Sequence, residues 1–119
     1  MRSMQNMPPM PVRFFMTDSG TEPVRDWLKY DLSEEERKIV GRDIKIIQFS
    51  WPEGMPLVKP LGEGLWELRS SFRDKIARVI FTIHSGQFIL LHGFVKKDQK
   101  IRKKDLEIAL RRKSLFKKG

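Results

Sequence analysis

The stretch that decides the fold is LWELRSSFRDKIARVIFTIHSGQFILLHGFV, residues 65–95. It contains three runs rich in β-branched and aromatic residues, which are Leu65–Phe72, Ile76–Ile83 and Gln87–Val95. Short turn-like segments separate them, around Arg73-Asp74 and around Ser85-Gly86. Because the separations are so short, neighbouring runs are expected to pair as antiparallel hairpins. The stretch therefore predicts a three-stranded meander.

Upstream of the meander, the sequence predicts one strand and two helices. The strand is expected at Val12–Met16, and Pro23 suits the first turn of a helix that ends near residue 30. Ser33 and Glu36 have the spacing of a capping box, and apolar residues then recur with a helical period until about residue 49. The glycines and prolines of residues 55–64 predict a loop between this second helix and the meander.

Downstream of the meander, Lys103–Phe116 combines an apolar helical period with basic flanks, which predicts an amphipathic C-terminal helix. The expected order of elements is β-α-α-β-β-β-α, an α+β fold with the two N-terminal helices packed on one face of the sheet. We expect a single domain over residues 12–119, preceded by a disordered leader at residues 1–11.

The composition narrows the classes of function. The 119 residues include no cysteine, which excludes disulfides and thiolate metal sites. No apolar run approaches the roughly 18 residues that a membrane-spanning helix needs. The sequence has no signal-peptide pattern and no phosphate-binding glycine loop, and His84 and His92 lack the spacing of a metal site. We therefore expect a cytoplasmic protein without a metal or other cofactor.

The positive charge is concentrated at one end of the chain. Residues 96–119 contain eleven Lys or Arg and three Asp or Glu, so they hold +8 of the formal net charge of +9. A nearly neutral body with a cationic end is typical of a protein that binds a polyanion such as nucleic acid. The alternative is a solvated basic tail.

The two hairpin turns also predict which side chains share a face of the sheet. Centring the hairpins on their turns pairs Leu68 with Val79, and Val79 with His92. One face is then apolar and is expected to be the core under the N-terminal helices. Its members are Trp66, Leu68, Ala77, Val79, Phe81, Ile83, Phe88, Leu90 and Phe94, with His92 between the last two.

The same register brings two arginines together on the other face. Arg69 is expected opposite Arg78, and Arg78 opposite Gly93. Two guanidinium groups beside a glycine, on an exposed face, predict a binding site for a phosphate group. The alternative is that Glu67, which lies diagonally across the strands, neutralises one of the arginines.

The chain resembles a known family in three segments: VRFFMTDSGTEPVRDWL from residue 12, VKPLGEGLWELRSSF from residue 58, and KIARVIFTIHSGQFILLHGFVKKDQK from residue 75. They are similar to the RelE/ParE toxin superfamily, and in particular to its phage-derived, HigB-like branch. The resemblance covers residues 12–115. It implies a RelE-like fold, a toxin that cuts messenger RNA on the ribosome, and a cognate antitoxin, often one with a helix-turn-helix domain.

The resemblance also implies a set of functional residues. The catalytic basic residues of the family fall on Lys59, Arg69, Arg78, Lys96 and Lys97. The further cations that are expected to contact RNA are Lys100, Arg102, Lys103, Lys104, Arg111 and Arg112. Many RelE-type enzymes use a tyrosine near the C-terminus, whereas the single tyrosine of this chain is Tyr30.

Metal-independent cleavage of this kind is an attack by the ribose 2′-OH on the neighbouring phosphorus, and it needs a base, an acid and stabilisation of the transition state. Arg69 and Arg78 suit the stabilising role because they stay charged. Lys59 or Lys96 can transfer a proton if neighbouring cations lower its pKa, and Glu67 is an alternative base. For His92 the pattern favours a hydrogen-bonded core residue, with proton transfer as the alternative.

Two other functions remain open from the sequence. One is inhibition of DNA gyrase by protein contact, as in ParE-type toxins, which does not need Lys59, Arg69 and Arg78 to converge. The other is a non-catalytic basic protein whose C-terminal helix binds RNA or DNA, with an affinity that depends on salt.

Overall fold

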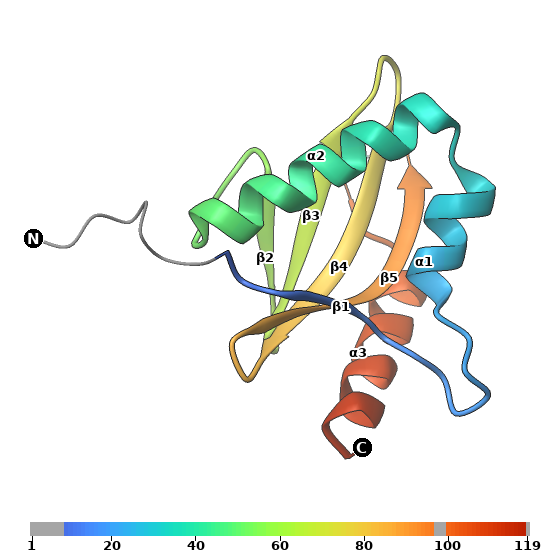
Figure 1. Cartoon of the computed structure of the whole chain (residues 1–119), viewed down its shortest axis with the longest axis vertical. Coiled ribbons are helices and arrows are strands. Elements are labelled where there is room, and N and C mark those ends of the chain that lie inside the picture. Colours follow the sequence, from blue (N-terminus) through green and yellow to red (C-terminus); the bar gives the residue numbers. More distant parts are fainter. Residues whose placement is uncertain (1–8, 97–99, 119) are drawn as a thin grey trace, which may run out of the picture.

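The computed structural model describes residues 9–96 and 100–118, which form a five-stranded sheet with helices on both faces (Figure 1). The strand order is β1-β5-β4-β3-β2. The strands are β1 (Val12–Phe14), β2 (Val58–Gly62), β3 (Leu65–Ser71), β4 (Ile76–His84) and β5 (Gln87–Lys96). The predicted meander of β3, β4 and β5 is confirmed, but the sheet is mixed rather than antiparallel, because β1 runs parallel to β5.

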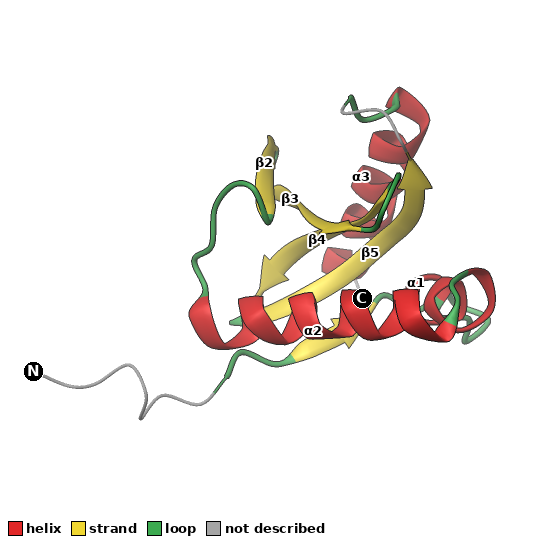
Figure 2. Ribbon diagram, turned by 90° about the horizontal axis from the view of Figure 1, so that it is seen from above, coloured by secondary structure: helices red, strands yellow, loops and turns green. Residues whose placement is uncertain are grey.

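The helices lie where the sequence predicts them, with one refinement. The first helical segment begins at Pro23 and consists of α1 (Pro23–Asp26) followed by η2 (Trp27–Asp31), a π-helical turn. Next comes α2 (Glu34–Ser50), and α3 (Lys103–Lys118) closes the chain. Figure 2 shows α2 along one side of the sheet and α3 on the other side.

The predicted capping box holds the start of α2. The Ser33 hydroxyl accepts a hydrogen bond from the Glu36 backbone N–H at 3.1 Å, and the Glu36 carboxylate accepts one from the Ser33 backbone N–H at 3.0 Å. Lys75, which precedes β4, lies 3.0 Å from the other carboxylate oxygen of Glu36. These hydrogen bonds, first those from Ser33 and then that from Lys75, lower the pKa of Glu36 below its ordinary value. The first turn of α2 is thereby fixed to the meander.

The predicted loop at residues 55–64 is partly wrong, because β2 lies within it. β2 pairs antiparallel with β3 and places Lys59 opposite Glu67. It is an edge strand, so Pro60 within it does not interrupt a ladder on both sides. The hairpin turn at residues 62–64 has positive φ at all three positions, and glycine occupies two of them. The proline and the glycines therefore hid a strand and its turn.

A bulge in β5 overturns part of the predicted register. Phe81 pairs with Leu90 as expected, but Ile80 pairs with His92, so Leu91 is an extra residue in β5. Beyond the bulge, Val79 pairs with Gly93 rather than with His92, and Arg78 pairs with Phe94 rather than with Gly93. One inserted residue reverses the direction of the side chains that follow it. His92 and Phe94 therefore leave the predicted core face.

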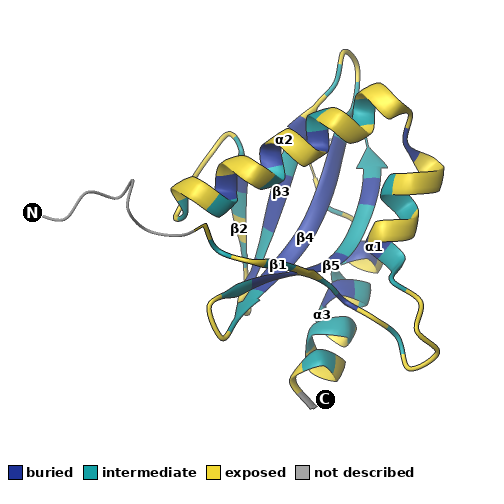
Figure 3. Cartoon of the chain, in the orientation of Figure 1, coloured by how far each residue is buried: buried dark blue, intermediate teal, exposed yellow. Residues whose placement is uncertain are grey.

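The sheet is buried on both faces, whereas one core face was predicted (Figure 3). Against α1 and α2 lie most of the predicted core residues, including Leu68, Val79 and Phe81. Against α3 lies a second cluster, whose buried members are Phe15, Leu65, Ile80, Ile89, Leu91, Phe94 and Ala109. The side of the sheet that holds Arg69 and Arg78 is therefore partly covered by α3 and is not an open surface.

Tryptophan side chains position the helices on the first core. Trp51, at the end of α2, packs edge-on against the rings of Trp66, Phe81 and Phe88, with centroid distances of 5.3–5.6 Å. Trp27 lies against Gly93, where a Cβ atom would come within 2.4 Å of the indole ring. The glycine that sequence reasoning placed under a ligand instead makes room for a helix.

The first eight residues of the predicted leader lie outside the described part of the chain. Met10, which was also assigned to the leader, exchanges two hydrogen bonds with Gln48 of α2: its backbone N–H donates to the Gln48 carbonyl at 2.9 Å, and its carbonyl accepts from the Gln48 side chain at 2.8 Å. Within residues 9–96 and 100–118, no helix is long and apolar enough to cross a membrane.

Two glycine-to-alanine substitutions are expected to have opposite effects on stability. Gly93→Ala forces a Cβ into the Trp27 ring and should lower the free energy of unfolding by about 1–3 kcal/mol. Gly41→Ala places a Cβ in open space within α2 and should raise it by about 0.5–1 kcal/mol. Urea denaturation of both variants checks the pair, and a Gly93→Ala protein as stable as the wild type would contradict this packing.

Candidate functional site

The two arginines that the sequence predicts side by side are indeed opposite each other, in β3 and β4. Arg78 is fully buried, and its guanidinium donates a hydrogen bond to the carboxylate of Glu67 at 2.9 Å. The Nε atom of Arg69 lies 3.7 Å from the same carboxylate oxygen, and its side chain is 10% exposed. One carboxylate thus lies beside two guanidinium groups, and the three residues form a buried charge cluster.

The predicted phosphate site is therefore wrong in its geometry. Arg78 does not face solvent, and the glycine expected beside it lies in the opposite direction, against Trp27. The alternative that the sequence left open, neutralisation by Glu67 diagonally across the strands, is confirmed. A buried guanidinium needs such a partner because removing a charge from water costs several kcal/mol. Arg78 thus serves to hold Glu67 rather than to bind a ligand.

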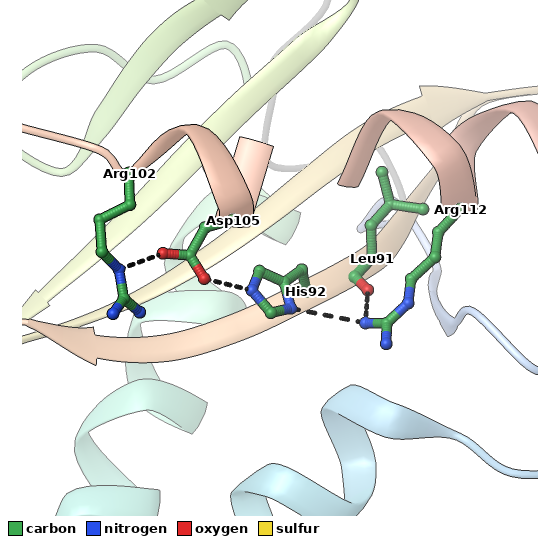
Figure 4. A network of polar contacts seen from close by, with 5 residues as sticks. All are labelled: Leu91, His92, Arg102, Asp105 and Arg112. Carbon is green, nitrogen blue, oxygen red and sulfur yellow. Dashed lines mark hydrogen bonds and ion pairs between the residues drawn. The ribbon is translucent and has the colours of Figure 1, made fainter. Parts of the chain in front are cut away.

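A second polar cluster lies between β5 and α3 and is centred on His92 (Figure 4). The Nε2 atom of His92 is 2.7 Å from a carboxylate oxygen of Asp105, whose other oxygen accepts a hydrogen bond from Nε of Arg102 at 2.7 Å. On the other side of the ring, Arg112 donates to the backbone carbonyl of Leu91 at 2.8 Å and lies 3.5 Å from Nδ1 of His92. The imidazole is therefore placed between a carboxylate and a guanidinium.

The electrostatics of this cluster favour a neutral imidazole. Burial lowers the pKa of His92, and the hydrogen bond to Asp105 offsets this only in part. Burial alone would raise the pKa of Asp105, but its hydrogen bonds with His92 and Arg102 bring that pKa below its ordinary value. Since Asp105 is ionised, the neutral His92 donates its Nε2–H to it and keeps a lone pair on Nδ1.

His92 and Lys59 belong to one row of side chains across the sheet. Strand pairing aligns Lys59, Glu67, Ile80 and His92 on neighbouring strands, so all four are on the α3 side. With strands about 4.8 Å apart, the Cα atoms of Glu67 and His92 are separated by roughly 10 Å. The buried charge cluster and the His92 cluster are thus close neighbours. Lys59 is half-buried at the edge of the row.

The other predicted basic residues are distributed along the path from β5 to α3. Lys96, at the end of β5, donates a hydrogen bond to the Lys100 carbonyl at 2.6 Å. Lys97 lies outside the described residues. Lys100, Arg102, Lys103, Lys104 and Arg111 are exposed, whereas Arg112 is half-buried. The structure therefore brings Arg102 and Arg112 to His92 and leaves the remaining cations of α3 on its surface.

Comparison with known proteins agrees with this architecture. The model of the family described as phage-derived protein Gp49-like (DUF891) matches residues 26–114, which is most of the chain. The chain belongs to the Gp49-like family. In general terms this is a family of RelE/ParE-like toxins. No curated protein matches the chain.

Sequence reasoning missed one residue of the candidate site, Asp105. It is an acid within the basic run KIRKKDLEIALRRK, it is 2% exposed, and it anchors both His92 and Arg102. Its position three residues after Arg102 was the available signal, since residues three apart are neighbours at the start of a helix. Within the described parts of the chain, no three His, Asp or Glu side chains gather as a metal site would require.

Neutralising Glu67 should destabilise the Gp49-like chain strongly. Glu67→Gln removes the carboxylate that Arg78 and Arg69 approach inside the protein, and we expect the free energy of unfolding to fall by about 3 kcal/mol or more. Glu63→Gln, in the exposed turn after β2, makes the same chemical change and should alter stability by less than about 0.5 kcal/mol. Chemical denaturation compares them, and equal small effects would contradict a buried ion pair.

The stability of the chain should depend on pH through His92. Because the folded state lowers the pKa of His92, the unfolded state binds more protons as pH falls below its ordinary pKa of about 6.5. The free energy of unfolding should therefore decrease between about pH 7.5 and pH 5.5, and His92→Gln should remove that component. Asp105, whose pKa is also lowered, adds a loss only below about pH 4. If the free energy of unfolding changes with pH equally in the wild type and in His92→Gln, His92 is not the source of the pH dependence.

Proposed function

We propose that this Gp49-like chain is the toxin of a type II toxin–antitoxin system, and that it is a ribosome-dependent, metal-independent endoribonuclease of the HigB-like branch. It would act in the cytoplasm on messenger RNA and be silenced by a cognate antitoxin of the helix-turn-helix type that the family resemblance implies. The observation that carries the proposal is the neutral imidazole of His92, oriented by Asp105 and flanked by Arg102 and Arg112.

The proposed proton acceptor is His92. Cleavage begins when the ribose 2′-OH loses its proton and its oxygen attacks the adjacent phosphorus. A neutral imidazole can accept that proton at Nδ1, which lies 3.5 Å from Arg112, and the resulting imidazolium would be stabilised by Asp105, 2.7 Å from Nε2. The lowered pKa of His92 supports the role, because it keeps the base unprotonated at neutral pH. The sequence favoured a core role for this residue, and the bulge in β5 moves it to the α3 side.

The proposed stabilisation of the transition state comes from guanidinium groups at the same place. Arg102 uses Nε to bind Asp105, and its side chain is 53% exposed, so its terminal N–H groups remain available to a phosphate. Arg112 lies on the opposite side of the imidazole (Figure 4). The proton for the departing 5′-oxygen would come from a lysine, for which Lys59 and Lys96 are the candidates. Glu67 lies in the same row of side chains as His92, two strands away, and Arg69 lies beside Glu67.

Binding to the ribosome is expected to use the surface of α3 and the segment before it. Lys100, Lys103, Lys104 and Arg111 are exposed there. Such cations contact phosphates without reading sequence, which suits a toxin that is delivered to its substrate by ribosomal RNA. The concentration of +8 of the net +9 charge in residues 96–119 supports this assignment.

One observation favours a second candidate function. The predicted pair of phosphate-binding arginines is replaced by an internal ion pair, because Arg78 is 0% exposed. A toxin that poisons DNA gyrase by contact, as ParE-type toxins do, needs no such pair. This function does not require His92 as a catalytic base. The two candidates therefore predict different effects of His92→Gln, which should abolish RNA cleavage but should not prevent inhibition of gyrase.

Expression of the chain without an antitoxin should stop growth and produce new messenger 5′ ends that are phased with codons. His92→Gln should reduce the yield of these ends by about 100-fold or more, which is the usual effect of losing a catalytic base. Arg25→Ala, on α1 and remote from the site, is the matched control and should cut normally. Mapping of 5′ ends after brief induction provides the readout, with the soluble amount of each variant measured in parallel.

Two results would contradict the endoribonuclease. Growth arrest by His92→Gln at full strength, with codon-phased ends still present, would remove His92 from the mechanism. Growth arrest with intact messenger RNA and a DNA-damage response would indicate that the protein inhibits DNA gyrase and does not cleave RNA.

A further inference from the structure

A large cavity lies along the free edge of β1, and Arg112 of the His92 cluster borders it. It is a groove of about 1280 Å³ between β1 and the C-terminal half of α3. All five consecutive residues from Val12 to Met16 line it. Because successive side chains of a strand point to opposite faces, a pocket on one face would touch only every second residue. The groove therefore follows the backbone edge of β1.

The backbone of β1 is bonded to the sheet on one side only. The Pro11 carbonyl accepts from the Phe88 N–H at 2.9 Å, and the Phe15 N–H donates to the Leu90 carbonyl at 3.0 Å. In a parallel ladder alternate residues point to the partner strand, so the N–H and C=O groups of Val12 and Phe14 point away from β5. β1 is the last strand in the order over the part of the chain that the structure describes. Such an edge is a template for a further strand.

The chemistry of the walls indicates what that strand would be. Four cations line the groove, namely Arg13, Arg111, Arg112 and Lys117, against two carboxylates, those of Asp18 and Glu22. Two large apolar side chains are exposed along it, Met16 at 55% and Leu115 at 51%. A partner is therefore expected to combine backbone pairing groups, apolar side chains and negative charge.

We propose that this groove binds an extended acidic segment of a partner protein, which pairs with β1 as a sixth strand. Pairing with Val12 and Phe14 would supply backbone hydrogen bonds, and alternate side chains of the segment would meet Met16 and Leu115 or the cations. The inference does not depend on RNA cleavage, because it rests on the backbone edge of β1, although Arg111 and Arg112 border both sites.

Single-stranded RNA is the competing occupant, and the groove suits it less well. Binding of unpaired bases relies on exposed aromatic rings for stacking. Of the phenylalanine rings that line the groove, Phe15 is 4% exposed and Phe14 packs against the first core. The ring of Phe116 is contacted by the Arg13 guanidinium, 5.5 Å from its centroid, and by the ring of His84 at 5.3 Å. None of these rings presents an open stacking surface.

The test uses the full chain, labelled with ¹⁵N, and the synthetic peptide acetyl-Val-Glu-Val-Glu-Val-Asp-Val-amide as the probe. At saturating peptide, amide hydrogen exchange at Val12 and Phe14 should slow by at least tenfold, because these N–H groups gain partners. The double variant Arg13→Glu/Arg111→Glu should weaken binding by roughly tenfold, as expected for two partly exposed charge pairs. Lys45→Glu, which makes half of this charge change on α2, should leave the affinity unchanged.

A second variant separates strand pairing from simple charge attraction. Val12→Pro removes an N–H that points away from β5 and keeps the bonds of Pro11 and Phe15, so it should abolish binding while a thermal melt shows a folded protein. The proposal is overturned if the peptide does not bind, or if it binds without protecting Val12 and Phe14. It is also overturned if the peptide with lysine in place of each acid binds equally well, or if oligouridine occupies the groove instead.

Discussion

The extra residue in β5 determines where His92 and its polar partners lie. By opposing Ile80 with His92 and Phe81 with Leu90, the bulge places Leu91 in the second core and sends His92 toward α3. It also directs Gly93 toward the N-terminal helices, where only a residue without a side chain leaves room for Trp27. Without the bulge, an imidazole would enter the core under α2, and an aromatic ring would follow it. The bulge in β5 thus determines both the position of the helical segment that contains Trp27 and the position of the His92 cluster.

Charge inside the protein is organised around two carboxylates, one for each cluster. Glu67 lies between two guanidinium groups within the sheet, and Asp105 joins α3 to β5 through His92 and Arg102. In a strongly cationic chain, each buried acid relieves repulsion among nearby cations. The two acids have different consequences, since one fixes strands that were already paired while the other sets the tautomer and the orientation of an imidazole.

The sequence was sufficient where structure depends on local pattern. The β3–β4 register, with Leu68 opposite Val79, follows from a short turn and strict alternation, and the capping box at Ser33 follows from spacing alone. It was insufficient where a single residue changes the outcome. An inserted residue such as Leu91 leaves no mark in composition, and Pro60 concealed an edge strand. Asp105 was hidden within a basic run, although its contacts reach across to β5.

The parallel pairing of β1 with β5 has a consequence for how the chain acquires its structure. Val12 lies beside Phe88, so the strand that leaves the ribosome first completes the sheet last. The helical segment and the meander join near neighbours in sequence and can form beforehand, whereas β1 must close a loop that includes most of the chain. Until β5 is synthesised, the apolar side chains of β1 have no sheet to join. Pairing of β1 with the sheet therefore cannot precede the synthesis of β5.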